Sequence, residues 1–452
     1  MKWLSVKRIH LVIEWTKNKL TKRQFILFSS VLVGLSAGLA AIVLKFFVHY
    51  VYIIATFYKG ENLKYLLLIL PFIGILLTVL AVKKILKGKL DKGLANIHDA
   101  IKNDASIIPN EQMYAQILTS SLTVGMGGSA GLEAPIVITG AALGSNYSTT
   151  YGLTVKDRTL LLACGVAAGI AAAFNAPIAG VLFALEVLLL DVAMSAFTPV
   201  IIAAATGALI SKIILQDEIL LSFKLQQPFD YYNVPYYILL GVFAGLVSVY
   251  HSRTFTKIER LFSKKKKKVY VNVFAGGVAL AGLIFIFPSL FAEGFESLKV
   301  LSLQKPENLL DNSFLHTYKN NEWFVLLFVG VLIFIKAVAT AITIGSGGNG
   351  GNFAPSLFVG AYLGFFFSRL VNLLNFTNLP ESNFTIVGMA GILSGIYHAP
   401  LTAIFLIAEI TGGYTLMIPL MIVASISFAI SRYFEPYSLD RKKNNLAPLS
   451  NR

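Results

Sequence analysis

GGSAGLEAP, from Gly127 to Pro135, and GGNGGNFAP, from Gly347 to Pro355, share the frame G-G-x-x-G-x-x-A-P. Glycine lets a backbone approach a ligand or another helix closely, and proline fits the first turn of a helix, where its missing N–H group costs nothing. Each copy therefore predicts a helix start, whose unpaired N–H groups and positive dipole end favour an anion. The alternative is that both are glycine-rich packing motifs, which are common in membrane helices.

The composition around these motifs indicates a membrane protein. Of the 452 residues, 56% are hydrophobic and 13% are charged, whereas about a quarter of the residues of a soluble protein are charged. Apolar runs such as Phe25 to Val48 and Phe324 to Ile342 approach or exceed the roughly 20 residues that a spanning helix needs. Shorter runs, broken by glycine or proline, predict half-spanning helices that are buried in protein or line a cavity.

The repeated frame belongs to a larger duplication. GVAAGIAAAFNAPIAGVLFALE, from Gly165, matches GMAGILSGIYHAPLTAIFLIAE, from Gly388, without a gap. A weaker pair, GLSAGL from Gly34 and GVFAGL from Gly241, opens the two halves. Three pairs in the same order predict two homologous halves of one membrane domain.

We place the first membrane repeat at residues 25–232 and the second at residues 233–438. Residues 1–24 are expected to form a basic segment on the cytoplasmic membrane surface, and residues 439–452 a short cytoplasmic tail. No cytoplasmic regulatory domain is expected.

Basic residues set the expected orientation of the halves. Residues 1–24 contain seven Lys or Arg, and residues 83–92 contain five Lys. The matching loop of the second half, residues 292–312, is largely acidic or neutral. The basic run at residues 251–268 follows the helix that contains Gly241, whereas residues 1–24 precede the helix that contains Gly34. If positive charge lies inside, the halves have opposite topology, and both termini are cytoplasmic. Inverted repeats with interrupted helices are typical of transport proteins whose site lies near the membrane midplane.

Glu133 supplies the charge that distinguishes the first copy from the second. A carboxylate within the membrane is costly and is a functional candidate by default. Ionised, it could occupy the anion site itself, and protonated or swung away it would leave that site open. The alternative role is that of a helix N-terminal charge or capping-box partner. Glu186 and Glu409 occur symmetrically in both halves, so we expect them to bond helix ends.

The sequence lacks the motifs of metal sites, disulfide frameworks, nucleotide binding and nucleophilic catalysis. His98 and His398 are not set in a metal-binding spacing such as HExxH, and Cys164 is the only cysteine, so neither a metal site nor a disulfide framework is expected. P-loop and nucleophile-elbow frames are absent from the sequence. Because the basic clusters flank apolar segments, they indicate topology rather than nucleic acid binding. We therefore expect neither an enzyme nor a cofactor.

These motifs together resemble the CLC family of chloride channels and proton/chloride exchangers. GLEAP, Gly131 to Pro135, is similar to the family's G-K/R-E-G-P, and GNFAP, Gly351 to Pro355, to its G-x-F-x-P. The similarity runs from about residue 25 to residue 440. It implies an all-α polytopic membrane protein with two inverted-topology repeats, whose tilted and half-spanning helices meet near the midplane. It also implies a homodimer with an anion pathway in each subunit.

The resemblance assigns roles by position. Glu133 matches the gating glutamate, the backbone N–H groups of Asn352 and Phe353 would hold the central anion, and Tyr437, in EPYSLD, would donate its hydroxyl. Main-chain contacts nearer the outside are expected from Leu132, Ala134 and Ala354.

Two departures from the family pattern bear on function. The family's G-S-G-I-P falls on DKGLA, Asp91 to Ala95, so Lys92 replaces the serine and, with Gly93, is an inner-mouth candidate. Lys92 could attract anions or be an ordinary member of the basic cluster. Proton exchangers of the family often carry an inner glutamate directly after the position of Glu186, and that position is Val187.

The main hypothesis is therefore a passive channel for chloride or similar small anions, gated by Glu133, in a bacterial-type inner membrane. One alternative is a proton-coupled chloride or fluoride antiporter of the same fold, since water could carry the proton. The other is a non-transporting membrane receptor or scaffold. Apart from the anion, the expected partners are membrane lipid and possible protons.

Overall fold

Helices account for the regular structure of the part of the chain that the computed structural model describes: residues 13–55, 63–188, 196–215, 228–263, 268–303, 305–311, 313–412 and 414–441. Within these ranges the only β pairing is an isolated bridge, and nine helices are long and apolar enough to cross a membrane. The predicted fold class is confirmed. Residues 1–12 and 442–452, which hold half of the predicted basic segment and most of the predicted tail, lie outside the described residues.

The helices follow one order in each half. The first half contains α2 (Lys22–Ala55), α3 (Leu63–Lys84), α4 (Ala95–Asn103), α5 (Gln112–Gly125), α6 (Glu133–Thr150), α7 (Val155–Phe174), α8 (Pro177–Phe183) and α9 (Phe197–Leu215). The second half repeats this order with α10 (Val234–Ser263), α11 (Val269–Ile286), α12 (Phe295–Ser302), α13 (Glu322–Gly345), α14 (Phe353–Leu373), α15 (Glu381–Tyr397), α16 (Pro400–Ile410) and α17 (Met417–Phe434).

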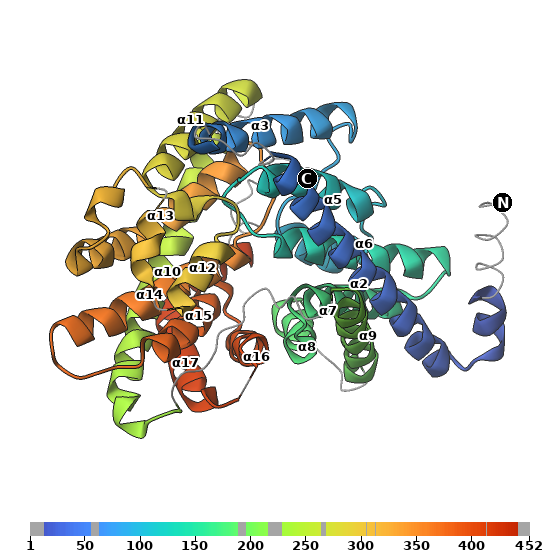
Figure 1. Cartoon of the computed structure of the whole chain (residues 1–452). Coiled ribbons are helices and arrows are strands. Elements are labelled where there is room, and N and C mark those ends of the chain that lie inside the picture. The colour runs from blue at the N-terminus through green and yellow to red at the C-terminus, as the bar shows by residue number, and fades with distance from the viewer. Residues whose placement is uncertain are drawn as a thin grey trace.

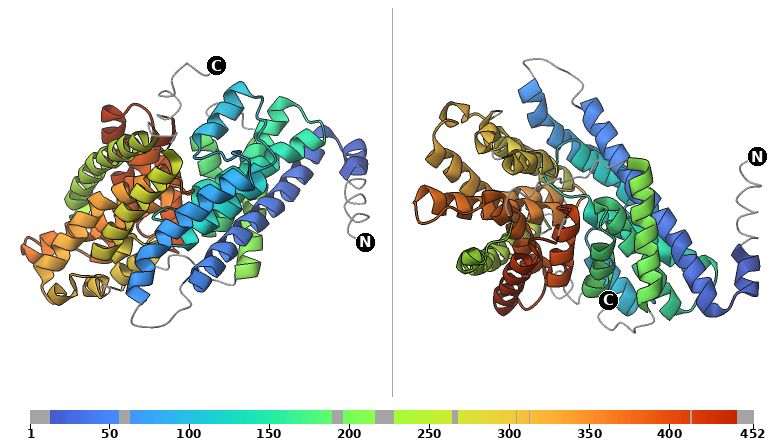
Figure 2. Two further views of the ribbon diagram at one scale, coloured as in Figure 1. Left: turned by 90° about the horizontal axis from the view of Figure 1, so that it is seen from above. Right: turned by 60° about the horizontal axis from the view of Figure 1, so that its bottom comes forward.

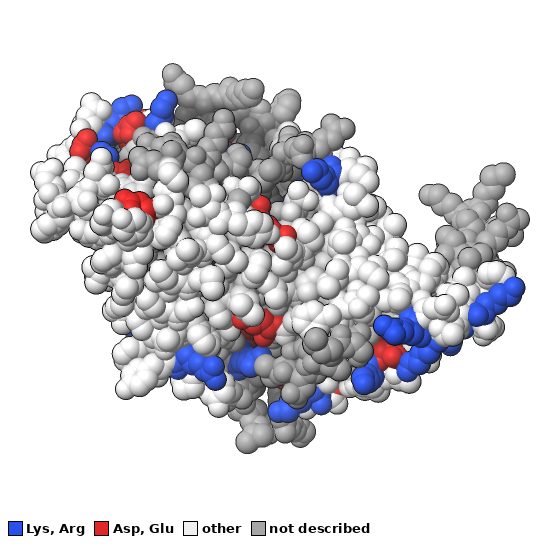
Figure 3. All heavy atoms as spheres, turned by 90° about the horizontal axis from the view of Figure 1, so that it is seen from below, with Lys and Arg blue, Asp and Glu red and all other residues white. Residues whose placement is uncertain are grey.

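The two halves lie largely side by side, as the blue-to-green and yellow-to-red colours show in Figure 1 and in both views of Figure 2. The helices α3 and α11, from different halves, pack together at the top of Figure 1. Large areas of the face in Figure 3 carry no charged atoms, and Lys and Arg gather along its lower edge. This distribution is the one expected of a molecule surrounded by lipid.

Glycine pairs lie at close helix crossings, at equivalent places in the two halves. A Cβ atom added to Gly165 in α7 would lie 2.0 Å from the carbonyl oxygen of Gly140 in α6. In the second half, a Cβ atom on Gly388 in α15 would lie 2.3 Å from the carbonyl oxygen of Gly360 in α14. Both crossings therefore require backbones without side chains between them.

The short helices α8 and α16 bind each other's ends through two glutamates. The Glu409 carboxylate accepts hydrogen bonds from the N–H groups of Ile178 (3.0 Å) and Ala179 (2.8 Å) at the start of α8. Glu186 accepts from Leu401 (3.2 Å) and Thr402 (2.8 Å) at the start of α16. The predicted structural role of this symmetric pair is confirmed.

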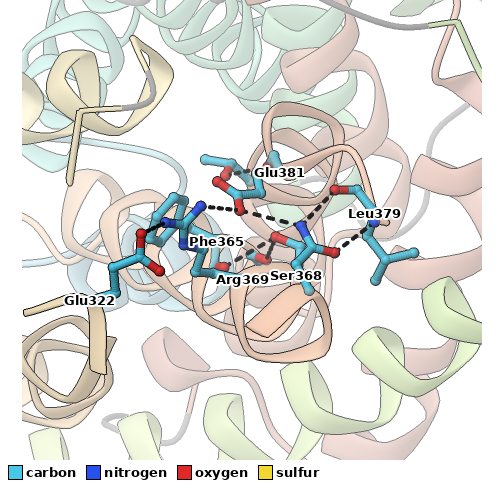
Figure 4. Close-up of polar contacts among 9 residues, drawn as sticks. Glu322, Phe365, Ser368, Arg369, Leu379 and Glu381 are labelled. Carbon is cyan, nitrogen blue, oxygen red and sulfur yellow. Dashed lines mark hydrogen bonds and ion pairs between the residues drawn. The ribbon is translucent and has the colours of Figure 1, made fainter. Parts of the chain in front are cut away.

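A polar cluster joins three helices of the second half (Figure 4). Arg369, on α14, pairs with Glu322 at the start of α13 (3.2 Å) and with Glu381 at the start of α15 (3.1 Å). Asn372 donates to the carbonyl of Leu379 (3.0 Å) and accepts from its N–H group (2.7 Å), which fixes the turn before α15. Since both carboxylates lie at helix starts, they also complement the helix dipoles.

Candidate functional site

The two copies of the glycine-rich frame meet directly. The N–H group of Gly131 donates to the carbonyl oxygen of Gly351 (2.8 Å), and the N–H group of Gly351 donates to that of Gly131 (2.7 Å). A Cβ atom on Gly351 would lie 2.8 Å from the Cβ atom of Ala134, so the close approach depends on glycine. The starts of α6 and α14 are thereby held against each other, as the repeated frame predicts.

Glu133 is the first residue of α6 and reaches across to the other half. Its side chain is 4% exposed. Its Oε2 atom accepts a hydrogen bond of 3.3 Å from the N–H group of Ala354, in the first turn of α14. A negative charge at a helix N-terminus is stabilised by the helix dipole and by the free N–H groups. The Glu133 carboxyl therefore occupies the kind of position that an anion would take at α14.

Both helix starts border a small cavity. Its volume is about 30 Å³. A bound water molecule needs roughly 10–15 Å³ of such space. Six of the predicted site residues line it: Lys92, Gly93, Glu133, Ala134, Asn352 and Phe353. Leu132 and Ala354 are buried nearby, where the N–H group of Leu132 donates to Glu293 and that of Ala354 to Glu133.

Aromatic rings cover the cavity on the side of Phe353. The ring centroid of Phe353 lies 5.7 Å from that of Phe174, 6.0 Å from that of Phe183 and 5.4 Å from that of Tyr397. Asn352 is the N-cap residue of α14. Its side-chain Oδ1 atom forms a hydrogen bond of 3.0 Å with Nε2 of His251. This wall of the cavity therefore consists of backbone N–H groups and aromatic rings.

Tyr437 does not join the site. Its side chain is 53% exposed, and it is not among the residues that line the cavity. The tyrosine of the cavity wall is Tyr397, at the C-terminal end of α15. It stands where Phe174 stands in the first half, and the sequence motifs did not single it out.

Lys92 is more than a member of a solvated basic cluster. Its Nζ atom donates to the carbonyl oxygens of Gly347 (2.9 Å) and Gly348 (2.8 Å), at the start of the second glycine-rich frame. Gly93, beside it, has a φ of +79°, a conformation that L-residues other than glycine rarely adopt. The ammonium group is therefore held at the wall of the cavity by contacts with the opposite half.

The far end of the chain adds a carboxyl group to the same wall. Leu439 and Asp440 line the cavity, and Asp440 is buried. The sequence motifs gave no sign of Asp440, because the last residues have no counterpart in the repeat. Val187 is buried in the π-helical turn Ala184–Leu188 and does not line this cavity.

Two inverted halves whose interrupted helices meet at a cavity are typical of an inverted-repeat membrane transport protein. A family model described as voltage gated chloride channel matches residues 73–432. The chain therefore belongs to this family, the CLC family, whose activity is anion transport.

Individual relatives agree with this assignment. The chain is 28% identical over 364 residues to a putative chloride channel protein ClcB-like from Ralstonia nicotianae, covering 78% of this chain and 80% of that one. It is 29% identical over 380 residues to the chloride channel protein CLC-e of Arabidopsis thaliana, covering 78% of this chain and 50% of the longer plant protein.

Solved structures share the fold. The structure of a slow cyanobacterial Cl⁻/H⁺ antiporter matches with a TM-score of 0.76 at 20% identity, covering 95% of this chain and 100% of that one. That of a CLC-type fluoride/proton antiporter matches with a TM-score of 0.73 at 24% identity, covering 92% of this chain and 97% of that one.

Proposed function

We propose that this chain passes chloride or a similar small anion through a pathway within each subunit, and that Glu133 is the gate of that pathway. The observation that carries the proposal is the bond from the N–H group of Ala354, at the start of α14, to the Glu133 carboxyl. A mobile anion and the carboxylate would compete for the same donors. Protonation or rotation of Glu133 would then open the pathway.

The anion would be held mostly by the backbone. We assign its central contacts to the N–H groups of Asn352 and Phe353, which border the cavity. Tyr397 takes the hydroxyl role in place of the exposed Tyr437, since its ring lies in the cavity wall. Further contacts towards the outside come from the main chain of Leu132, Ala134 and Ala354. Such a site lets the anion leave as readily as it enters, because backbone N–H groups supply its central contacts and the ammonium group of Lys92 is bonded to the carbonyls of Gly347 and Gly348.

A passive channel is our main proposal, because Val187 stands where the family's proton exchangers often carry a glutamate. One observation favours the alternative, a proton-coupled chloride or fluoride antiporter. Asp440 lines the same cavity as Glu133, so two carboxyl groups border that cavity. In liposomes with an imposed proton gradient, the reversal potential of a channel follows the anion gradient alone, whereas that of an antiporter shifts with pH.

The gate assignment is tested by Glu133→Gln. The amide has nearly the shape of the protonated acid, so the variant is expected to conduct at neutral pH and to lose most of the acid-dependent rise in flux. Anion efflux from liposomes at a series of pH values measures this. Glu296→Gln, on the exposed surface of α12, is the matched control and should retain the rise. Unchanged pH dependence in Glu133→Gln would refute the gate.

We further propose a homodimer in a bacterial-type inner membrane, with both termini cytoplasmic. The helices α8, α9, α16 and α17 contact one another in a connected group. They present exposed apolar side chains, among them Ile178, Ile201, Leu401 and Ile418. A second copy of the chain would cover this apolar face, and lipid would cover the remaining ones. The proposed repeat boundaries, residues 25–232 and 233–438, follow from the matching order of the helices.

A further inference from the structure

Lys92 and Glu293 occupy matching places in the two inverted halves. Lys92 precedes Gly93 and the short helix α4, and Glu293 precedes Gly294 and the short helix α12. Both glycines have positive φ angles, +79° for Gly93 and +90° for Gly294. The same glycine turn is therefore preceded by a cationic side chain in the first half and by a carboxyl side chain in the second.

Each of these side chains contacts the glycine-rich frame of the opposite half. The Nζ atom of Lys92 binds the carbonyls of Gly347 and Gly348, as described above. The Oε1 atom of Glu293 accepts a hydrogen bond of 3.3 Å from the N–H group of Leu132. Glu293 is thus bonded to the residue directly before the gate, Glu133.

Two lysines balance the two carboxyl groups. Lys336, in α13, is fully buried, and its Nζ atom donates to Oγ of Ser129 (3.0 Å) and to the carbonyl oxygen of Ala292 (3.3 Å). The charges of Glu133, Lys45 on α2 and Lys336 all act on Glu293. Lys45 in turn donates to the carbonyl oxygen of Ala173, which fixes its position.

The counterpart of Lys336 in the first half is neutral, so the fold alone does not require a charge at this position. In the first half, Gln116 stands at the position of Lys336, and its Nε2 atom donates to the carbonyl oxygen of Asp91 (2.6 Å). This contact mirrors the one from Lys336 to Ala292. Because glutamine performs the structural task there, the charge of Lys336 has a purpose besides packing. A buried cation is costly unless opposite charges accompany it.

We propose that Glu293 is a second proton-binding carboxyl, which transfers protons between the outer solution and Glu133, while Lys45 and Lys336 are the fixed counter-charges. The proposal rests on the proposed function of Glu133 as the gate. In the transfer, the acid form of Glu293 gives its proton to the Glu133 carboxylate. The negative charge then stays on Glu293, where the N–H group of Leu132 and the two lysines stabilise it.

The exposure of the two carboxyls gives the direction of the relay. Glu133 is almost wholly buried, whereas Glu293 is half-buried and lies in the loop between α11 and α12, outside the nine apolar spans. Burial and then the neighbouring Glu133 carboxyl raise the pKa of Glu293, against the opposing effects of Lys45, Leu132 and Lys336. Two interacting carboxyls hold their protons as a pair, because ionising both at once is unfavourable.

Glu293→Gln tests the relay, because the amide can still accept from Leu132 but cannot carry a proton. The full-length protein is reconstituted in liposomes, and anion flux is followed after a rapid step of the outside pH from about 7.5 to about 5, a range that brackets carboxyl titration. We expect the rise in flux to slow by about tenfold or more, in line with the loss of a proton-transfer group. Glu293→Asp should restore much of the rate.

Two further variants keep the outcomes distinct. Glu296→Gln, on exposed α12, should respond as the wild type does. The double variant Glu133→Gln, Glu293→Gln should conduct as Glu133→Gln does, because Glu293 has no carboxylate at position 133 to which it could transfer a proton. A wild-type response in Glu293→Gln would overturn the relay while leaving the gate intact. Failure of Glu293→Asp to recover would also overturn it, whereas unchanged pH dependence in Glu133→Gln would overturn the proposed function itself.

Discussion

Glu133 and Phe353 stand at the same place in the two copies of the frame, and they give the site its asymmetry. The carboxyl of Glu133 binds the start of α14, whereas the ring of Phe353 packs against Phe183 and Tyr397 and leaves only its backbone for an anion. A gate needs one removable negative group, and two would repel each other across the bridge between Gly131 and Gly351.

Lys92 offers a second test at the residue scale. Lys92→Met keeps the length of the side chain and removes the charge at the cavity wall, so we expect anion flux to fall several-fold. The fall should be larger at low ionic strength, because salt screens the attraction within a Debye length of about 10 Å at 0.1 M. Flux into and out of liposomes at low and high salt measures this. Lys92→Arg should retain the salt dependence, and a loss equal at both salt concentrations would show a purely structural role.

The residue scale also shows where the sequence was sufficient. Glu133 could be predicted from a charge within an apolar, repeated frame. The tyrosine of the cavity wall could not be predicted, because the choice of Tyr437 depended on an alignment of the last residues, which have no repeat to fix their register. Tyr397 and Glu293 became evident once the halves were placed against each other in space, since Tyr397 lines the cavity between the repeats and Glu293 accepts a hydrogen bond from Leu132 of the other half.

At the scale of helices, close glycine crossings are expected to govern stability. Gly165→Val places a side chain where even a Cβ atom would lie 2.0 Å from the carbonyl oxygen of Gly140, so the helices must separate. We expect a loss of about 1–3 kcal/mol in the free energy of unfolding, as for other overpacked sites. Gly388→Val should cost a similar amount, because it stands at the equivalent crossing with Gly360.

Thermal unfolding in detergent measures these losses, and the chain offers a matched control. Gly282, in α11, has no atom within 4 Å of an added Cβ. Gly282→Val should therefore change the melting temperature much less than either crossing variant. Equal melting temperatures for Gly165→Val and Gly282→Val would show that the α6–α7 contact is not limiting.

The sequence predicted the helix starts within the repeated frame. Glycine and proline marked the starts of α6 and α14, because their backbone preferences are local. The reciprocal bonds from Glu186 to α16 and from Glu409 to α8 join residues more than 200 positions apart, so local preferences indicate only that such carboxyls need a partner. The π-helical turn at Ala184–Leu188 was not predicted, since its spacing differs little from that of an α-helix.

The whole molecule combines a symmetric scaffold with asymmetric charge. Helix order, glycine crossings and end-to-end glutamate bonds are repeated in both halves, whereas three matched positions differ in charge: Lys92 and Glu293, Gln116 and Lys336, and Glu133 and Phe353. The inversion sends the members of each pair towards opposite sides of the membrane. In the proposed pathway, the duplication makes the two ends similar, and the exchanged charges make them different.

That inversion is testable through two exposed loops. Lys87, in the basic loop after α3, and Lys305, in the matching loop of the second half, are both exposed. Because basic loops stay inside, we expect a membrane-impermeant maleimide to label Lys305→Cys in intact cells and Lys87→Cys only after permeabilisation. The native Cys164 is fully buried and should remain unlabelled, so the parent protein is its own background control. Labelling of both loops from the same side would contradict the opposite orientation of the halves, and with it the placement of Glu293 at the outer mouth and Lys92 at the inner one.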